Sequence, residues 1–140
     1  MILRNTKLKD YDRVLNVMID WWGGRDLRNT VYKGFFVHFT ETSFIVEDQN
    51  GSPIAFLLGF LSQTYRDEAF INWIGVHPDW RKKGIAKMLY SRFFEIAREN
   101  ERGRVTCTTA LVNTDSMRWH RHMGFSVEEK QDSFFFSKDI

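Results

Sequence analysis

The sequence has little of what marks several large protein classes. It contains one cysteine, Cys107, and only two prolines among its 140 residues. A single cysteine excludes an internal disulfide and fits a reducing compartment. The longest apolar run, at about 54–61, is too short to span a bilayer. The amino terminus also lacks the apolar core of a signal peptide. We therefore expect a cytoplasmic protein with no membrane partner.

A strong excess of one charge is also missing. The chain has 20 Lys and Arg against 18 Asp and Glu, a formal net charge of +2. Because non-specific nucleic-acid binding depends on a basic excess, this balance argues against a nucleic-acid partner. What the chain does have is aromatic residues, with 13 Phe and 5 Trp. They predict a dense aromatic core or an apolar groove with rings on its walls. The length is that of one domain, so we expect a single domain over 1–140.

Hydrophobic periodicity predicts strands and helices in a mixed order. Apolar residues recur at helical spacing in some segments and in short, β-branched or alternating runs in others. We expect helices at about 9–22, 27–40, 84–99 and 114–123, and strands at about 1–4, 43–47, 54–61, 70–76, 104–112, 125–129 and 134–138. This order predicts an α/β (α+β) fold, a mixed sheet of about 6–7 strands with about four helices on its two faces.

The stretch FINWIGVHPDWRKKGIA, residues 70–86, joins a strand to a helix through a basic turn. Strict alternation would place Phe70, Asn72, Ile74 and Val76 on one face, and Ile71, Trp73 and Gly75 on the other. The first turn of the helix leaves backbone N–H groups without partners, and Gly84 and Ala86 leave those groups accessible. Such a junction can hold a phosphate or pyrophosphate. Neither the P-loop ending nor the Rossmann G-x-G-x-x-G is present.

Two other interpretations of the basic turn remain open. Arg81, Lys82 and Lys83 could form a solvated turn, or a short basic patch for nucleic acid. The position of the turn between a strand and an amphipathic helix favours the phosphate site.

The spacing V-x-P-x-x-R-x-x-G-x-A, formed by Val76, Pro78, Arg81, Gly84 and Ala86, resembles the signature of the GNAT superfamily of acetyl-CoA-dependent N-acetyltransferases. The resemblance implies that the loop amides bind the coenzyme A pyrophosphate. It also implies a mostly antiparallel, splayed sheet in which the strand before the loop pairs with the pantetheine arm. The coenzyme contacts implied on this segment are Ile74, Gly75, Val76, Arg81, Lys82, Lys83, Gly84, Ile85, Ala86 and Lys87.

A second segment, NTDSMRWHRHMGF at 113–125, is similar to another motif of the same family. The resemblance implies that Asn113 hydrogen-bonds the pantetheine or substrate side of the cleft, and that Ser116 and Trp119 line the coenzyme arm. It also places His120 where many members have a tyrosine, the general acid that protonates the departing thiolate. Imidazole can donate a proton near neutral pH, so His120 is the candidate acid. The alternative is a histidine that only packs or hydrogen-bonds in the cleft. We expect His122 to be solvated.

The resemblance predicts an acetyltransferase that moves the acetyl group from acetyl-CoA to a primary amine by direct attack in a ternary complex. Acetyl-CoA is the expected co-substrate, with no metal. The strand before Asn113 offers Cys107, Thr108 and Thr109 and no carboxylate, so we expect a water-mediated base and name no residue for it. Cys107 is expected to be a buried apolar residue rather than a nucleophile. The alternative function is a non-catalytic acyl-CoA-binding sensor of the same fold.

The acceptor is expected to be a small amine or a peptide end. By the resemblance, its pocket lies between the two amino-terminal helices and the final hairpin. These segments supply Asp20, Trp21, Trp22, Arg25, Asp26, Arg28, Tyr32, Phe36, Gln131, Asp132 and Phe134. Packing is the expected role of Trp22 and Phe36. Homodimers are common in the family, and exposed aromatic residues would suit one.

Overall fold

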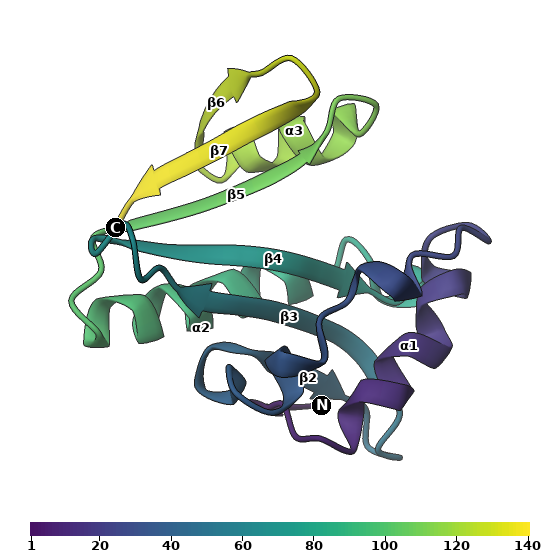
Figure 1. Ribbon diagram of the computed structural model, residues 1–140. Helices are drawn as coiled ribbons and strands as arrows, with labels where there is room; N and C mark the ends of the chain where they lie inside the picture. The colour runs from purple at the N-terminus through teal and green to yellow at the C-terminus, as the bar shows by residue number, and fades with distance from the viewer.

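The structure is a computed structural model that describes residues 1–140. Seven strands form one sheet in the order β1-β2-β3-β4-β5-β7-β6 (Figure 1). The strands are β1 (Ile2–Asn5), β2 (Phe44–Glu47), β3 (Pro53–Leu61), β4 (Glu68–Val76), β5 (Arg104–Ala110), β6 (Ser126–Glu129) and β7 (Ser133–Asp139). The helices are α1 (Asp10–Trp21), α2 (Ile85–Glu99) and α3 (Thr114–His122). Only β4 and β5 pair in parallel, which confirms the predicted mixed, mostly antiparallel sheet. None of the helices combines the length and apolar character needed to cross a membrane.

Two hydrophobic clusters lie on opposite faces of the sheet. Because side chains alternate along a strand, Phe44 and Val46 of β2 join one cluster while Ile45 joins the other. The first cluster packs against α2, which lies behind β3 and β4 in Figure 1. The second packs against α1 and the segment that follows it. The sheet is therefore covered on both faces, as the order of elements predicts.

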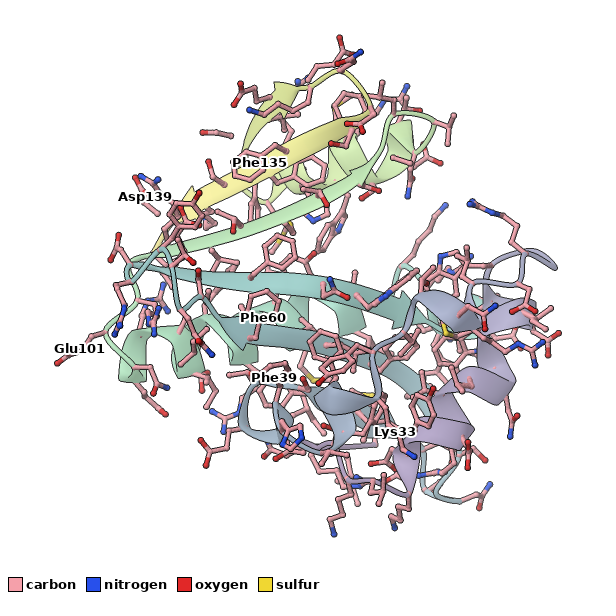
Figure 2. The ribbon with its side chains drawn as sticks, viewed as in Figure 1. Lys33, Phe39, Phe60, Glu101, Phe135 and Asp139 are labelled. Carbon is pink, nitrogen blue, oxygen red and sulfur yellow. The ribbon has the colours of Figure 1, made fainter.

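The predicted helix over 27–40 is wrong. The segment forms three short 3₁₀ turns, at Arg28–Thr30, Lys33–Phe36 and Thr40–Thr42. Gly34 explains part of this difference. A Cβ on Gly34 would lie 2.0 Å from the Tyr32 ring, so the ring can occupy this place only because the residue is glycine. Phe39 then lies next to Phe60 of β3, with ring centroids 5.9 Å apart (Figure 2). Tertiary packing of aromatic rings thus replaces the helix, and the chain has three α-helices rather than about four.

A bulge in β4 overturns the predicted alternation of its side chains. The register passes from Leu58↔Trp73 to Gly59↔Ile71, so Asn72 has no partner on β3. An extra residue in one strand shifts every later side chain to the other face. Ile71, Ile74 and Val76 therefore all face the α2 cluster. On the other face, Phe70 stacks on Phe60, Trp73 joins the α1 cluster, and Gly75 lies against Trp22 and Phe56.

The two halves of the sheet separate between β4 and β5. These strands pair only from Glu68↔Arg104 to Ile71↔Cys107. Beyond that point β4 stays with β3, while β5 stays with β7 as far as Ala110↔Ser133. Figure 1 shows the resulting wedge, closed near the carboxyl terminus and open at the other end of the strands. The splayed sheet implied by the GNAT resemblance is present.

The amino terminus is anchored by a network of two arginines and two carboxylates. Asp10 is fully buried and accepts hydrogen bonds from Arg4, Arg13 and the Lys7 N–H. Both arginines also pair with Glu47 of β2, at 2.7 and 2.9 Å. Burial alone would raise the pKa of Asp10, but these hydrogen bonds hold it below its usual value. The network ties β1 and the start of α1 to the sheet.

Candidate active site

The loop before α2 presents a run of backbone amides with no partner in the protein. Lys82 and Gly84 adopt left-handed conformations, with φ of 61° and 81°. No backbone N–H from 82 to 87 donates a hydrogen bond within the protein, whereas Met88 N bonds to Gly84 O. Consecutive free amides at the positive end of a helix form a concave anion site. This is the arrangement that the R-x-x-G-x-A spacing predicts.

These amides border a groove of about 340 Å³. It is lined by Val76, Trp80, Arg81, Lys82, Gly84, Ile85, Ala86, Lys87, Trp119, His122 and Met123. Eight of the predicted coenzyme residues are therefore brought together here. Lys83 does not line the groove, and its ammonium lies 5.3 Å from the centroid of the Trp80 ring.

Arg81 has a second, structural role. Its guanidinium donates to Val76 O at 3.1 Å and to Trp21 O at 2.6 Å. The side chain thus joins the end of β4 to the end of α1 beside the groove.

A larger cavity of about 620 Å³ lies in the opening between β4 and β5. It is lined by Trp22, Arg25, Leu27, Thr30, Ile71, Asn72, Trp73, Ile74, Tyr90, Cys107, Thr108, Thr109, Ala110, Val112, Asn113, Ser116, His120 and Ser133. Of the predicted site residues, Ile74, Asn113, Ser116 and His120 are here. Gly75 borders neither space, because the bulge at Asn72 turns it towards Trp22 and Phe56. Its predicted coenzyme contact would therefore have to come from its backbone.

Helix α3 supplies one wall of each space. The Asn113 side chain caps the helix by accepting from Ser116 N at 3.1 Å, and its Nδ2 lies 3.4 Å from Thr109 Oγ1. His120 faces the cavity, while Trp119 and His122 face the groove. His122 is exposed, as expected, but its place on the groove wall was missed. The two spaces thus lie on either side of the same helix.

His120 is held in one orientation by hydrogen bonds at both ring nitrogens. Only 4 % of its surface is exposed. Nδ1 lies 2.7 Å from Ser116 O, and Nε2 lies 2.8 Å from the Tyr90 hydroxyl. The ring stacks on Phe136 of β7, with centroids 4.1 Å apart and planes 3° apart. Burial lowers the pKa of His120, so the neutral imidazole is favoured.

Tyr90 is a site residue that the sequence did not reveal. It lies on α2, lines the cavity and is 1 % exposed. Burial, followed by the adjacent Cys107, raises its pKa well above the usual value. Cys107 is buried as expected, and burial raises the pKa of its thiol to about 12. The i, i+4, i+7 spacing of Tyr90, Phe94 and Ala97 was the available signal for this wider buried face.

The cavity contains no carboxylate. None of its lining residues is Asp or Glu, and Arg25 is its only formally charged side chain. Of the residues expected to form the acceptor pocket, Trp22 and Arg25 line this cavity. Asp26 and Arg28 pair with each other at the surface, at 2.7 Å. The others do not line the cavity, and Trp21, Phe36 and Phe134 are buried.

A splayed sheet, a groove bordered by free amides and a cavity beside it form the arrangement that the GNAT resemblance of the two segments implies. Comparison with known proteins supports the same family. Residues 11–125 match the family described as the Acetyltransferase (GNAT) family, and the chain belongs to it. It therefore contains an acetyltransferase domain of that family.

One curated relative and two solved structures illustrate the similarity. An uncharacterized N-acetyltransferase of Methanocaldococcus jannaschii is 30 % identical over 93 residues, which are 64 % of this chain and 41 % of that protein. The PaiA N-acetyltransferase of Thermoplasma acidophilum, in complex with coenzyme A, has a TM-score of 0.84 at 15 % identity, covering 99 % of this chain and 98 % of its own. Diaminobutyrate acetyltransferase EctA of Paenibacillus lautus has a TM-score of 0.77 at 21 % identity, covering 99 % and 97 %. At these identities the two structures show the shared fold.

Proposed function

We propose that the protein transfers the acetyl group of acetyl-CoA to a primary amine by direct attack in a ternary complex. The observation that carries this proposal is that the groove and the cavity are walled by the same two elements, β4 and α3. β4 contributes Val76 to the groove and Ile74 to the cavity, and α3 likewise contributes to both. A coenzyme anchored by its pyrophosphate at the loop amides can therefore extend its arm along β4 towards an acceptor in the cavity.

The free edge of β4 supports the chemistry. Beyond Ile71 its β5 side has no partner strand, so backbone amides there are available to the pantetheine arm and to the thioester carbonyl. A donor aimed at the carbonyl stabilises the negative charge that develops on its oxygen during attack. Holding both substrates in one cavity supplies much of the rate by orientation.

The charge of the cavity narrows the acceptor class. A polyamine would meet no carboxylate on these walls, whereas a carboxylate next to the reactive amine could pair with Arg25. We propose that the acceptor is a small amine or peptide end, and that a carboxylate near the reacting nitrogen favours its binding. EctA, in complex with L-2,4-diaminobutyric acid, provides a precedent in this fold for an amine that bears a carboxylate.

The test is thiol release from acetyl-CoA with a panel of amines. 2,4-Diaminobutyrate and 1,3-diaminopropane form a matched pair, because they differ only by the carboxylate. Amine-dependent release that is faster with carboxylate-bearing amines or with peptides is expected. Release that requires a polyamine would contradict the proposed acceptor class, and no release with any amine would contradict acetyl transfer.

A non-catalytic acyl-CoA sensor is the second candidate. It is favoured by one observation, the lack of a carboxylate base in the cavity. Tight binding of acetyl-CoA without thiol release on addition of any amine would support it.

The cytoplasmic location and the homodimer stay predictions.

A further inference from the structure

We propose that Tyr90 and His120 form a proton relay that serves both as the base and as the acid of the transfer. Tyr90 is the catalytic residue that contacts the reacting atoms, and His120 is the positioning residue that stores the proton. This inference rests on the proposed acetyl transfer and supplies the proton path that it requires. It differs from the sequence-based hypothesis, in which His120 protonates the thiolate directly.

The tautomer of His120 follows from its partners. Ser116 O, 2.7 Å from Nδ1, can only accept a hydrogen bond, so Nδ1 carries the ring proton. Nε2 then has a lone pair, and the Tyr90 hydroxyl at 2.8 Å donates to it. A second proton can therefore enter the ring only at Nε2, by way of Tyr90.

No other group near the pair competes for this role. Around the two rings lie Cys107 from β5, Ser116 and Trp119 from α3, Phe125 and Phe136. Cys107 is the only titratable side chain among them, and its thiol stays neutral because burial raises its pKa to about 12. The remaining lining of the cavity offers no carboxylate and no second histidine.

The protons that the relay takes up and releases balance over the whole reaction. Attack of the amine on the thioester carbonyl forms the C–N bond and leaves a proton on nitrogen. The Tyr90 oxygen takes that proton while its own hydroxyl proton passes to His120 Nε2. Collapse of the tetrahedral intermediate breaks the C–S bond. Tyr90 then gives a proton to the thiolate, and His120 returns its extra proton to the Tyr90 oxygen. The products are the amide and the free thiol, with both side chains restored.

The test compares two variants with matched controls. Tyr90→Phe keeps the ring and removes the hydroxyl, and His120→Gln removes the titrating group. Tyr65→Phe and His38→Gln, both at exposed positions outside the groove and the cavity, are the controls. Tyr90→Phe should lower kcat about 100-fold, the usual size of an acid–base contribution, with KM for acetyl-CoA within about threefold. The controls should match the wild type.

The pH profile separates a relay from packing. Because His120 must be neutral to accept a proton, wild-type kcat should fall on the acid side, with a midpoint below pH 6.5. This limb should vanish in His120→Gln, and His120→Tyr should recover part of the rate without the limb. A Tyr90→Phe variant with near wild-type kcat, or an unchanged acid limb in His120→Gln, would overturn the relay.

Nitrogen-resolved NMR of the wild type tests the tautomer independently of activity. The expected state of His120 at pH 7 is neutral with the proton on Nδ1, and a proton on Nε2 would overturn the relay. A wild type without amine-dependent thiol release would overturn the relay and the proposed function together. An active wild type with an unaffected Tyr90→Phe variant would overturn the relay alone.

Discussion

Ile71 and Cys107 are the last paired residues of β4 and β5. The bulged Asn72 follows Ile71 directly, and the Cys107 side chain adjoins Tyr90 beneath the opening. The end of the ladder, the bulge and the Tyr90–His120 pair thus meet at one point of the fold. The cavity begins there because β4 and β5 are no longer paired beyond this point, so the free edge of β4 and the Tyr90–His120 pair face the same space.

The loop amides can be tested at Gly84. Gly84→Glu places bulk and negative charge where a pyrophosphate would lie. Losing one charge-assisted hydrogen bond, about 1.5–3 kcal/mol, corresponds to about 10- to 100-fold weaker acetyl-CoA binding by calorimetry. Gly51→Glu is the matched control, because both glycines have positive φ (+81° and +78°) and neither has an atom within 4 Å of an added Cβ. Unchanged binding in Gly84→Glu would refute the coenzyme site.

The buried histidine predicts a pH dependence of stability. Burial lowers the pKa of His120 below 6.5, so the folded state binds fewer protons than the unfolded state in the interval between the two pKa values. Stability is therefore full above about pH 6.5 and falls as the pH drops towards the folded pKa. In urea unfolding at pH 7.5 and 5.5, the wild type should lose more free energy than His120→Gln, by at most about 1.4 kcal/mol per pH unit. Equal losses would contradict the neutral buried imidazole.

The amino-terminal network predicts that replacing Asp10 lowers the free energy of unfolding strongly. Asp10→Ala leaves Arg4, Arg13 and the Lys7 N–H without their buried partner. Breaking a buried ion pair on one side costs about 3–5 kcal/mol, which denaturant unfolding can measure. Asp26→Ala removes the surface pair with Arg28 and should change stability little. The expectation fails if the two variants are equally stable.

Arg25 is expected to select the acceptor. Arg25→Ala should raise KM about tenfold or more for a carboxylate-bearing acceptor, because a charge-assisted contact of about 1.5–3 kcal/mol is lost. The same variant should leave KM for a neutral amine unchanged. Arg28→Ala, a change of the same kind at an exposed residue outside the cavity, is the control. Equal effects on both kinds of amine would show that Arg25 does not bind the carboxylate.

Cys107 should be dispensable for turnover. Its buried thiol, with a pKa of about 12, cannot supply a thiolate near neutral pH. Cys107→Ala should therefore keep most of the activity and cost about 1 kcal/mol of stability, as an average core substitution does. Steady-state and burst measurements of thiol release check this. Loss of turnover together with loss of a burst would indicate an acetyl-cysteine intermediate instead.

The predictions from sequence held where the signal was local. The Val76–Ala86 spacing identified the loop and the start of α2, where Gly84 has φ of 81°. They failed where distant packing decided the result. The helix expected over 27–40 gave way to aromatic contacts with β3, and the alternation along β4 broke at Asn72.

The sequence by itself determined the class of the protein, most of its strands and helices and the position of the loop before α2. Those features depend on periodicity, glycine conformation and spacing within about 15 residues. Only the tertiary structure decided the chemistry of the cavity. Tyr90 and His120 are separated by 30 residues and meet because α2 and α3 pack against the two diverging halves of the sheet. The proton on Nδ1 likewise follows from a carbonyl position that no spacing in the sequence specifies.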